Sequence, residues 1–516
     1  MFIRVYTGAI SGIEAVAVTA EVNVAAGGLG LFIVGLPDNT IKESHERIQA
    51  AFENSGFKLQ AKKTVVNLAP ADLRKEGSQY DLPIAIGILT ATEQITTDML
   101  ADSMFVGELS LNGELRGVKG VLPLVAMARA RGLKRVFMPK ENVAEGAVVE
   151  GIDVVGVDSL LELCEILSGH MPCVAAQHCM VDVEAETAGE YAEDFADVKG
   201  QAYVKRALEI AAAGGHNVIM IGPPGSGKTM LARRMPTIMP PMSLEEAVEA
   251  TKIHSVAGKL GENIGLMRKR PFRAPHHLTS QVALIGGGQS PQPGEVSLAH
   301  NGVLFLDELP EFGRNVLEVL RQPLEDRHIT VSRIQGTVDY PCNFMFVASM
   351  NPCPCGYYNH PTKACVCTPG QISRYLNKIS GPLMDRIDIQ CEILPLSFEE
   401  ISKASPGEPS SVIRERVMRA RNIQAQRFAD ISGVHCNAQM TEKHLREYCI
   451  LDAESNELLR LAMARLQLSA RAYSRILKVA RTIADLEASE TIQANHVAEA
   501  IGYRNLDRGD WAERRA

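Results

Sequence analysis

The 516-residue sequence has no run of about 18 apolar residues, so no segment has the length and hydrophobicity of a membrane-spanning helix. Residues 1–8 also lack the basic and apolar segments of a secretory signal peptide, and they are typical of a β-strand instead. No internal repeat or low-complexity tract is present. We therefore expect a cytoplasmic globular protein.

An excess of positive charge is missing as well. The chain has 53 lysine and arginine residues against 61 aspartate and glutamate residues, a net charge of −8. Any contact with nucleic acid therefore requires a local basic surface. A disulfide framework is not expected either, because eleven cysteines in a chain of this size indicate reduced thiols or metal ligands. The length predicts about three domains, and the hydrophobic content of 46% is enough for sizeable cores.

What the sequence does contain is a complete phosphate-binding loop. Residues 222–229 read Gly-Pro-Pro-Gly-Ser-Gly-Lys-Thr, between a segment typical of a buried strand, residues 217–221, and the start of a helix at Met230. Such a loop directs backbone N–H groups at phosphates, at a helix N-terminus whose dipole favours anions. Lys228 can reach the β- and γ-phosphates, and Thr229 can bind Mg²⁺. The predicted nucleotide-binding residues are Gly222, Pro223, Pro224, Gly225, Ser226, Gly227, Lys228, Thr229, Met230 and Asp307.

Residues 303–308, Val-Leu-Phe-Leu-Asp-Glu, supply the acidic strand end that such a loop needs. The strand would place Asp307 beside the metal ion, and Glu308 would then be free to orient and deprotonate a water molecule. Neither half alone makes a nucleotide hydrolase. Together the two motifs predict a Mg²⁺-dependent NTPase.

The order of structural patterns predicts an α/β protein with a helical C-terminal part. Residues 16–22 and 31–34 are typical of strands, and residues 39–54 of a helix. Residues 397–400 have the spacing of a helix-capping box, and residues 476–484 carry apolar side chains along one helix face. The predicted parts are an N-terminal α/β domain (1–168), an acidic linker (169–194), a core with a parallel sheet (195–395) and an almost wholly helical region (396–516).

Three longer stretches carry a family resemblance: residues 211–228 around the phosphate loop, residues 270–277 (Arg-Pro-Phe-Arg-Ala-Pro-His-His) and residues 293–308, which end in the acidic strand. They closely resemble the magnesium-chelatase-like AAA+ ATPases of bacteria, the YifB/ComM family, and the resemblance extends over essentially the whole chain. It implies an N-terminal domain of the Lon-protease type (the fold of ribosomal protein S5 domain 2), an AAA+ P-loop core and an all-helical lid of the magnesium-chelatase C-terminal type.

The resemblance also implies a function. The best-understood members of the family are ring-forming DNA helicases that drive branch migration. It therefore implies ATP and Mg²⁺ as cofactors, a homo-hexameric ring, and single-stranded or branched DNA as the partner in recombination or natural transformation. The ATPase subunit of magnesium chelatase is also similar, which leaves open a remodeller of a metal-insertion enzyme or of another protein partner. An ATP-dependent protease of the Lon type is the third alternative.

Two further catalytic roles follow from matching stretches of the family. Asn351, after an apolar strand, matches the sensor that holds the attacking water, although an asparagine before Pro352 is also a common turn former. Arg386 resembles the arginine finger, which would reach the γ-phosphate bound by a neighbouring subunit. The alternative for Arg386 is a surface salt bridge with Asp385 or Asp388.

The lid is expected to contribute one more arginine. Arg475 resembles the second sensor of the family, and Arg471 is the near alternative, because one helical turn separates the two. The predicted catalytic residues are Lys228, Glu308, Asn351, Arg386 and Arg475.

Two inserts resemble the pore-facing loops of the MCM and chelatase branch of AAA+ proteins. Residues 253–288 are far longer than the usual link after the first core helix, and residues 324–336 alternate like a β-hairpin. In a ring their basic residues would face a phosphate backbone in the central channel; the alternative is an ordinary solvated basic face. The candidate DNA-binding residues are Lys269, Arg270, Arg273, Arg327 and Arg333.

Four cysteines follow Asn351 with the spacing C-x-C-x₉-C-x-C. Four thiolates this close together can bind one Zn²⁺ tetrahedrally, with His360 as a spare ligand. The alternative is four reduced cysteines in a loop, because C-x-C is tighter than the common C-x₂-C spacing. The candidate zinc ligands are Cys353, Cys355, Cys365 and Cys367.

The N-terminal domain lacks the Ser–Lys pair that a Lon-type protease needs. In the stretches that resemble the serine and lysine regions of that protease, Gln79 stands at the nucleophile position and Leu124 at the lysine position. A serine such as Ser78 is not activated without a base nearby. We expect a degenerate domain that serves assembly or DNA contact.

Overall fold

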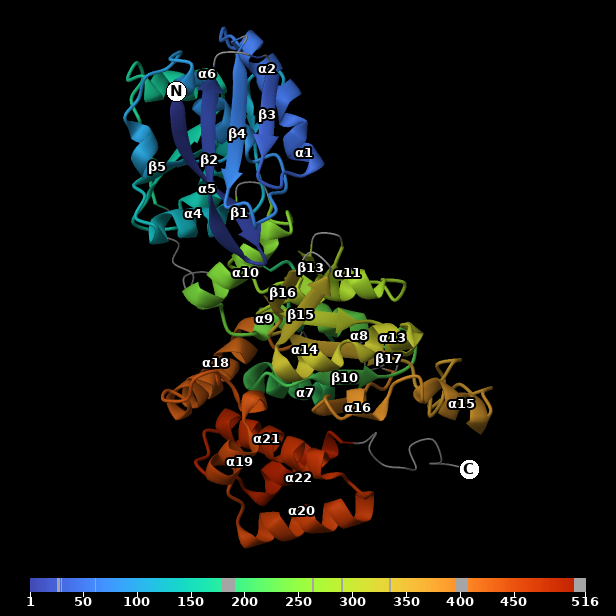
Figure 1. Cartoon of the computed structure of the whole chain (residues 1–516). Helices are drawn as coiled ribbons and strands as arrows, with labels where there is room; N and C mark the ends of the chain where they lie inside the picture. Colours follow the sequence, from blue (N-terminus) through green and yellow to red (C-terminus); the bar gives the residue numbers. More distant parts are fainter. Residues whose placement is uncertain are drawn as a thin grey trace. The chain divides into compact units, whose positions relative to one another are not determined.

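The computed structural model describes the chain except for residues 26–27, 29, 61, 179–190, 262–263, 289–290, 334–335, 396–406 and 505–516. The chain forms two compact units, Met1–Asp182 with Leu244–Met267 and Val183–Ser243 with Arg268–Ala516 (Figure 1). Among the described residues, no helix is long and apolar enough to cross a membrane. The predicted capping box and the middle of the predicted linker lie outside the described residues.

The first unit is built on a seven-stranded sheet with the strand order β3-β4-β2-β1-β5-β8-β9. The β1–β2 and β2–β4 pairs are antiparallel, and the other neighbouring pairs are parallel. The three strands predicted near the N-terminus are confirmed as β1, β2 and β3. The strands are β1 (Phe2–Ser11), β2 (Glu14–Ala25), β3 (Gly30–Val34), β4 (Lys63–Ala69), β5 (Ser103–Phe105), β8 (Arg135–Pro139) and β9 (Asp153–Val157).

Helices pack on both faces of this sheet. Every second residue of β2 from Val18 to Val24 is buried, and the residues between them are more exposed. The buried residues of β2 pack against α3 (Asp81–Ala91), whereas α4 (Val121–Ala130) packs on the other face, where Leu124 approaches Gly8 of β1. The predicted helix over residues 39–54 is present as α1 (Asn39–Lys42) and α2 (Ser44–Asn54), which are separate elements on either side of one residue.

Part of the long predicted insert belongs to this first unit. α10 (Leu244–Val256) packs against α4, and its Ser255 donates a hydrogen bond to the buried carboxylate of Glu145. Residues 244–267 fold with the first unit, although the motifs on either side of them in the sequence lie in the second. The predicted insert 253–288 is therefore divided between the two units.

The second unit contains a five-stranded parallel sheet with the order β11-β14-β17-β10-β18. β10, β14 and β17 are buried along their whole length, as expected for parallel strands covered on both faces. The predicted parallel α/β core is confirmed. The strands are β10 (Val218–Ile221), β11 (Phe272–Arg273), β14 (Val303–Leu306), β17 (Met345–Met350) and β18 (Ile389–Glu392).

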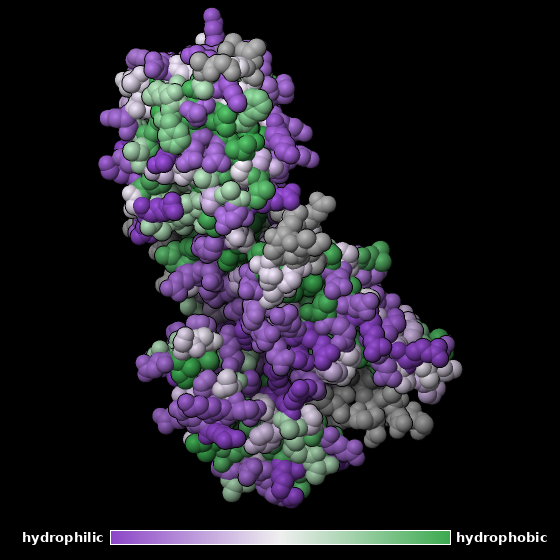
Figure 2. Space-filling view, viewed as in Figure 1, coloured by the Kyte–Doolittle hydropathy of each residue, from purple (hydrophilic) through white to green (hydrophobic). Residues whose placement is uncertain are grey.

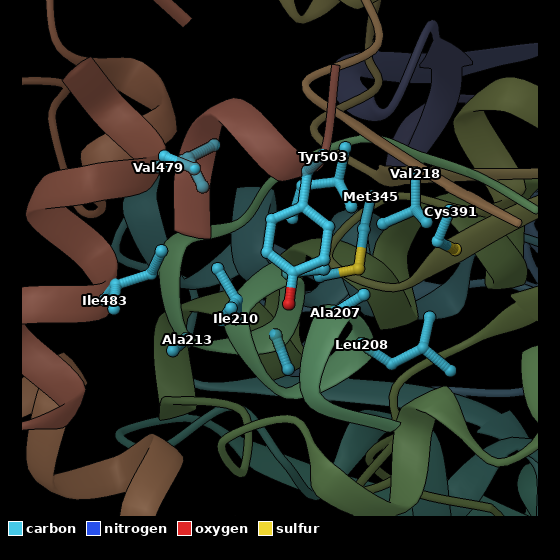
Figure 3. Close-up of a cluster of buried hydrophobic side chains, with 14 of the residues drawn as sticks. Ala207, Leu208, Ile210, Ala213, Val218, Met345, Cys391, Val479, Ile483 and Tyr503 are labelled. Carbon is cyan, nitrogen blue, oxygen red and sulfur yellow. The ribbon is translucent and has the colours of Figure 1, made fainter. Parts of the chain in front are cut away.

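The helical C-terminal region shares one hydrophobic core with this sheet. The helices that contribute to this core include α7 (Ala202–Gly214), α18 (Ser410–Arg427), α19 (Glu442–Tyr448), α20 (Ala453–Leu466), α21 (Ala470–Leu486) and α22 (Ala494–Gly502). Figure 3 shows Ile210 of α7, Val218 of β10 and Val479 of α21 in one buried cluster. The predicted apolar helix face at residues 476–484 is confirmed, because its six apolar side chains are buried. Core and lid therefore pack as one unit.

The second predicted insert is a hairpin, but it lies later in the sequence than predicted. β15 (His328–Arg333) pairs antiparallel with β16 (Gly336–Pro341), so the hairpin spans residues 328–341 rather than 324–336. The residues before it complete the last turn of α14 (Arg321–Asp326), which ends at Arg327 with a left-handed φ of 59°. On the face seen in Figure 2, hydrophilic side chains predominate over this part of the second unit.

Candidate functional site

The phosphate-binding loop joins the buried strand β10 to α8 (Lys228–Arg233). Gly225 and Gly227 adopt positive φ angles of 77° and 88°, which a residue with a side chain rarely adopts. The Ser226 hydroxyl is buried and has no hydrogen-bond partner among the described residues. A buried unpaired hydroxyl beside a helix N-terminus fits a loop built to receive phosphate oxygens.

Lys228 lies inside this loop. Its ammonium donates hydrogen bonds to the carbonyls of Gly222 at 2.7 Å and Pro223 at 2.9 Å, and to the Asn351 side-chain oxygen at 3.2 Å. Burial lowers the pKa of Lys228, whereas the nearby carboxylates of Asp307 and Glu308 act in the opposite direction. The ammonium is therefore held inside the predicted phosphate loop.

Asp307 follows β14 and meets Thr229 at the same edge of the sheet. The Thr229 hydroxyl donates to Asp307 Oδ2 at 2.7 Å, and the Ser349 hydroxyl donates to Asp307 Oδ1. A hydroxyl and a carboxylate are the hard oxygen ligands that Mg²⁺ prefers, with water and phosphate oxygens completing its shell. The residues present therefore fit a magnesium ion held by Thr229 and Asp307.

Glu308 has an unusual backbone conformation for a residue with a long side chain. Its φ and ψ are 54° and 51°, and its N–H donates to Ser349 Oγ at 3.3 Å. A left-handed non-glycine residue costs about 1–3 kcal/mol and persists where its surroundings fix it, often at functional sites. The turn leaves the Glu308 side chain exposed beside the Asp307–Thr229 pair, where it can reach a water molecule.

The predicted sensor Asn351 completes this group. It follows β17, which lies between β10 and β14, so the carboxyl ends of three neighbouring parallel strands carry the loop, Asp307 and Asn351. Asn351 precedes Pro352, as a turn former would, but its side-chain oxygen also accepts the hydrogen bond from Lys228.

The predicted arginines lie at the opposite edge of the same sheet. Arg386 precedes β18, which runs parallel to β10, and the Asp388 N–H donates to the Asn217 carbonyl at the start of β10. The phosphate loop follows the other end of β10. Arg386 and the neighbouring Arg475 therefore face away from the phosphate loop of their own chain.

Each of these arginines has a carboxylate partner within the chain. Arg386 pairs with Glu325, and the suggested partners Asp385 and Asp388 bind other arginines instead. Arg471 lies 3.2 Å from Asp385, and Arg475 lies 2.7 Å from Asp388. The alternative prediction for Arg386 was a salt bridge with Asp385 or Asp388. Arg386 does form a salt bridge, but its partner is Glu325. The reason is that the tertiary fold brings α14 next to Arg386.

Two functional neighbours were missed by sequence reasoning. Asn217 donates through its side chain to the Arg386 carbonyl at 2.9 Å and accepts the Phe346 N–H at 3.0 Å, so it connects the Arg386 segment to β10 and β17. Asp388 is buried; burial would raise its pKa, but Arg475 and the hydrogen-bonded His216 outweigh that effect and hold it well below the ordinary value. A polar residue directly before a buried strand, as Asn217 is, was the available signal.

The candidate DNA-binding residues do not form one free basic surface. Arg270 donates to the carbonyls of Pro240, Pro241 and Asn301, and Arg273 forms a bidentate ion pair with Glu295. Arg327 donates to Asn343. The Lys269 ammonium lies 5.6 Å from the centre of the Tyr191 ring, and the side chain of Arg333 lies outside the described residues. DNA contact by these five residues stays a prediction.

The four predicted cysteine ligands converge. Their sulfur atoms all lie within 4.8 Å of one another, and the Cys353, Cys355 and Cys365 sulfurs are 3.4–3.7 Å apart. Four sulfurs about 2.3 Å from one zinc ion would be about 3.8 Å apart. The spare ligand His360 is not part of this group of four, and its Nδ1 accepts the N–H groups of Thr362 and Lys363. The donor set therefore fits a closed four-thiolate zinc site.

In the first unit, Ser78 has an acidic partner instead of a lysine. Its hydroxyl donates to the Glu108 carboxylate. Leu124, at the expected lysine position, is fully buried in α4, and its methyl group lies 2.5 Å from where a Cβ on Gly8 would sit. This geometry is that of a packed core rather than of a nucleophile with its base.

Comparison with known proteins assigns similarity along nearly the whole chain. The family models "Magnesium chelatase, subunit ChlI", "Subunit ChlI of Mg-chelatase" and "Magnesium chelatase, subunit ChlI C-terminal" match residues 194–401, 20–142 and 407–504. Competence protein ComM of Haemophilus influenzae is 44% identical over 506 residues, and YifB of Escherichia coli is 44% identical over 510. Each match covers 98% of this chain and 97% of the relative. Lon protease 2 of Bacillus subtilis is 28% identical over 127 residues, which are 24% of this chain and 22% of that protein.

Proposed function

The chain belongs to the magnesium-chelatase-like YifB/ComM family, and from that premise we propose that it is a ring-forming AAA+ motor that couples ATP hydrolysis to work on DNA. The family supports an ATPase in general, with ATP and Mg²⁺ as its cofactors. The finer proposal is a homo-hexameric helicase that promotes branch migration in recombination or natural transformation. Its relationship to a protein named for competence supports this direction.

The proposed hydrolytic step uses the residues at the carboxyl edge of the sheet. Lys228 neutralises the β- and γ-phosphates, and Thr229 and Asp307 hold the magnesium ion. When bound, that ion neutralises charge on the phosphate oxygens. Asn351 holds the attacking water, and Glu308 removes its proton. Ser349 keeps Asp307 oriented, because its hydroxyl donates to the carboxylate oxygen that Thr229 does not use.

The single observation that carries the ring proposal is the separation of two groups of residues across one sheet. Lys228, Asp307 and Asn351 gather at one edge, and Arg386 and Arg475 lie at the other. A phosphate bound by one chain cannot meet both groups of that chain. We propose that a neighbouring copy supplies Arg386 and Arg475, so that each complete site is formed by two subunits.

The four cysteines are proposed to hold a structural zinc ion. A closed site of four thiolates leaves no position for a reactive water. The loop they form contacts the phosphate loop, because a Cβ on Gly356 would lie 2.5 Å from Cδ of Pro224. The metal would therefore hold this loop in place against the phosphate loop, directly after Asn351.

The test is an ATPase assay of the purified chain with no nucleic acid, with single-stranded DNA and with forked DNA. A Glu308→Gln preparation, purified in parallel, measures contaminating activity. Stimulation of Glu308-dependent turnover by DNA, together with ATP-dependent strand displacement on the fork, is the expected outcome. Glu308-dependent turnover that no DNA stimulates would contradict the DNA motor.

Glu308-dependent turnover that no DNA stimulates would favour a remodeller of a protein partner. The match of three chelatase-subunit models supports this alternative. A protease is the weakest of the three functions, because Ser78 pairs with Glu108 and a buried leucine stands where the lysine is needed.

A further inference from the structure

The candidate finger Arg386 is held inside its own chain. Its side chain is only 11% exposed, and its guanidinium donates to the Pro382 carbonyl at 2.6 Å and pairs with the Glu325 carboxylate. The Nε atom is buried without a hydrogen-bond partner among the described residues. A finger acts by placing its guanidinium against a phosphate on another subunit. This arrangement therefore has to open before Arg386 can act.

Glu325 is placed to exchange with such a phosphate. Its side chain is 61% exposed, so water and ligands can reach the ion pair. The hydrogen bond from Arg386 is the main cause that lowers the pKa of Glu325, and Arg471 and Arg475 lower it further. The accessible Glu325 carboxylate thus binds the guanidinium of Arg386 that a phosphate of another subunit would have to contact.

Glu325 is also mechanically close to the hairpin. It lies in the last turn of α14, and two residues, Asp326 and Arg327, separate it from His328, where β15 begins. The carbonyl of Arg327 accepts the Cys342 N–H at 2.9 Å, which closes the base of the hairpin, and the Arg327 side chain donates to Asn343. A displacement of the hairpin is therefore transmitted to Glu325 through two residues and a closed hydrogen-bonded base.

We propose that Glu325 is a positioning residue that restrains Arg386 in the free chain, and that nucleic acid acting on the β15–β16 hairpin releases the arginine for hydrolysis on the neighbouring subunit. This rests on the proposed function, since it assumes both a ring and a DNA-facing hairpin. This restraint explains how nucleic acid at the β15–β16 hairpin would change the rate of ATP hydrolysis at the nucleotide site, which other elements form.

The test is Glu325→Gln, which keeps the size of the side chain and removes its charge. Asp326→Asn is the matched control, because Asp326 is the next residue, is exposed, and forms no ion pair in the part of the chain that the structure describes. Turnover at saturating ATP is measured with and without forked DNA, at a protein concentration where sedimentation shows equal assembly of all variants.

We expect Glu325→Gln to raise DNA-free turnover about two- to fivefold, as breaking a largely exposed ion pair allows. The DNA-stimulated rate should stay unchanged, so the stimulation ratio falls by the same factor, and Asp326→Asn should keep the wild-type ratio. Adding Arg386→Ala to Glu325→Gln should abolish the gain, because the gain acts through that arginine.

Two results would overturn the restraint. The first is a Glu325→Gln protein with the wild-type DNA-free rate and the wild-type stimulation ratio. The second is a folded, assembled Glu325→Gln protein with lower turnover, which would show that Glu325 assists hydrolysis instead of restraining Arg386. Failure of the proposed DNA motor would be seen in the wild-type protein, as ATP turnover that no DNA stimulates, and can therefore be distinguished from failure of the restraint. A raised DNA-free rate in Glu325→Gln would still establish the restraint in that case.

Discussion

Lys228 and Asn351 are 123 residues apart in the sequence, and the Lys228 ammonium donates a 3.2 Å hydrogen bond to the Asn351 side-chain oxygen. Two strands explain this contact. β10 ends at the phosphate loop and β17 ends at Asn351, and the two strands are parallel neighbours in register. We therefore expect a nucleotide phosphate that binds Lys228 to compete with Asn351 for its ammonium.

Lys228→Ala is expected to abolish nucleotide binding, because the loop loses its fixed cation. A charge-assisted hydrogen bond is worth about 1.5–3 kcal/mol, and two such bonds to phosphates predict a loss of affinity of at least about 100-fold. Titration with a fluorescent ATP analogue measures it. Lys443→Ala, at an exposed position on α19, is the control and should bind normally. Binding within threefold of wild type in Lys228→Ala would contradict the assignment of the loop.

Glu308→Gln should bind ATP normally and hydrolyse it about 100- to 10,000-fold more slowly, since only the general base is removed. Single-turnover hydrolysis and equilibrium binding on the same preparation separate the two effects. Turnover close to wild type would show that another group activates the water.

Arg386→Ala should leave ATP affinity nearly unchanged and lower turnover by about 10³-fold or more. Because the finger is proposed to act on a neighbour, mixing Arg386→Ala with Glu308→Gln should create some sites that carry an intact base and an intact finger. ATPase activity of the mixture above that of either parent is the expected result. A mixture that exchanges subunits and stays inactive would argue against action between subunits.

Replacing Cys365 and Cys367 by serine should release stoichiometric zinc, lower the thermal midpoint and reduce turnover, with ATP affinity retained. Elemental analysis of the wild-type protein gives the direct answer, with about one zinc per chain expected. Cys436→Ser and Cys449→Ser, both outside the cluster, control for the loss of a thiol. A fully active wild-type protein without zinc would leave four ordinary thiols.

Lys478 gives a prediction for pH. Burial, with Arg475 as the next contribution, lowers the pKa of this lysine to about 8. Between about pH 8 and 10.5 the unfolded chain binds the proton and the folded chain does not, so the contribution of Lys478 to stability rises with pH, by at most about 1.4 kcal/mol per pH unit. The thermal midpoint of wild type relative to Lys478→Met should therefore increase from pH 7.5 to pH 9.5. A constant or falling difference would contradict the lowered pKa.

The hydrolytic site was predictable from sequence because its parts are local. Asp307 and Asn351 directly follow apolar strands, and Lys228 ends the glycine-rich loop that follows a third. Parallel strands bring their carboxyl ends to one edge whatever the chain does between them. The Glu325–Arg386 pair was not predictable. Its members are 61 residues apart on elements whose contact depends on the packing of α14.

The boundaries of the hairpin were missed for a related reason. The alternating segment was predicted to begin at residue 324, but residues 324–326 belong to α14, and the left-handed Arg327 ends that helix. The placement of residues 244–267 could not be read from sequence either. An amphipathic helix shows that it has a partner face without showing which sheet or helix supplies it.

The assignment of α10 to the first unit has a practical consequence for dividing this protein. The backbone passes between the units three times, near residues 182, 243 and 267, so one cut in the acidic linker does not yield two independent pieces. A version that simply starts at residue 195 would still carry α10 but would lack α4, against which α10 packs. Such a fragment should aggregate. We expect that isolating the second unit requires excision of residues 244–267 and a linker between positions 243 and 268.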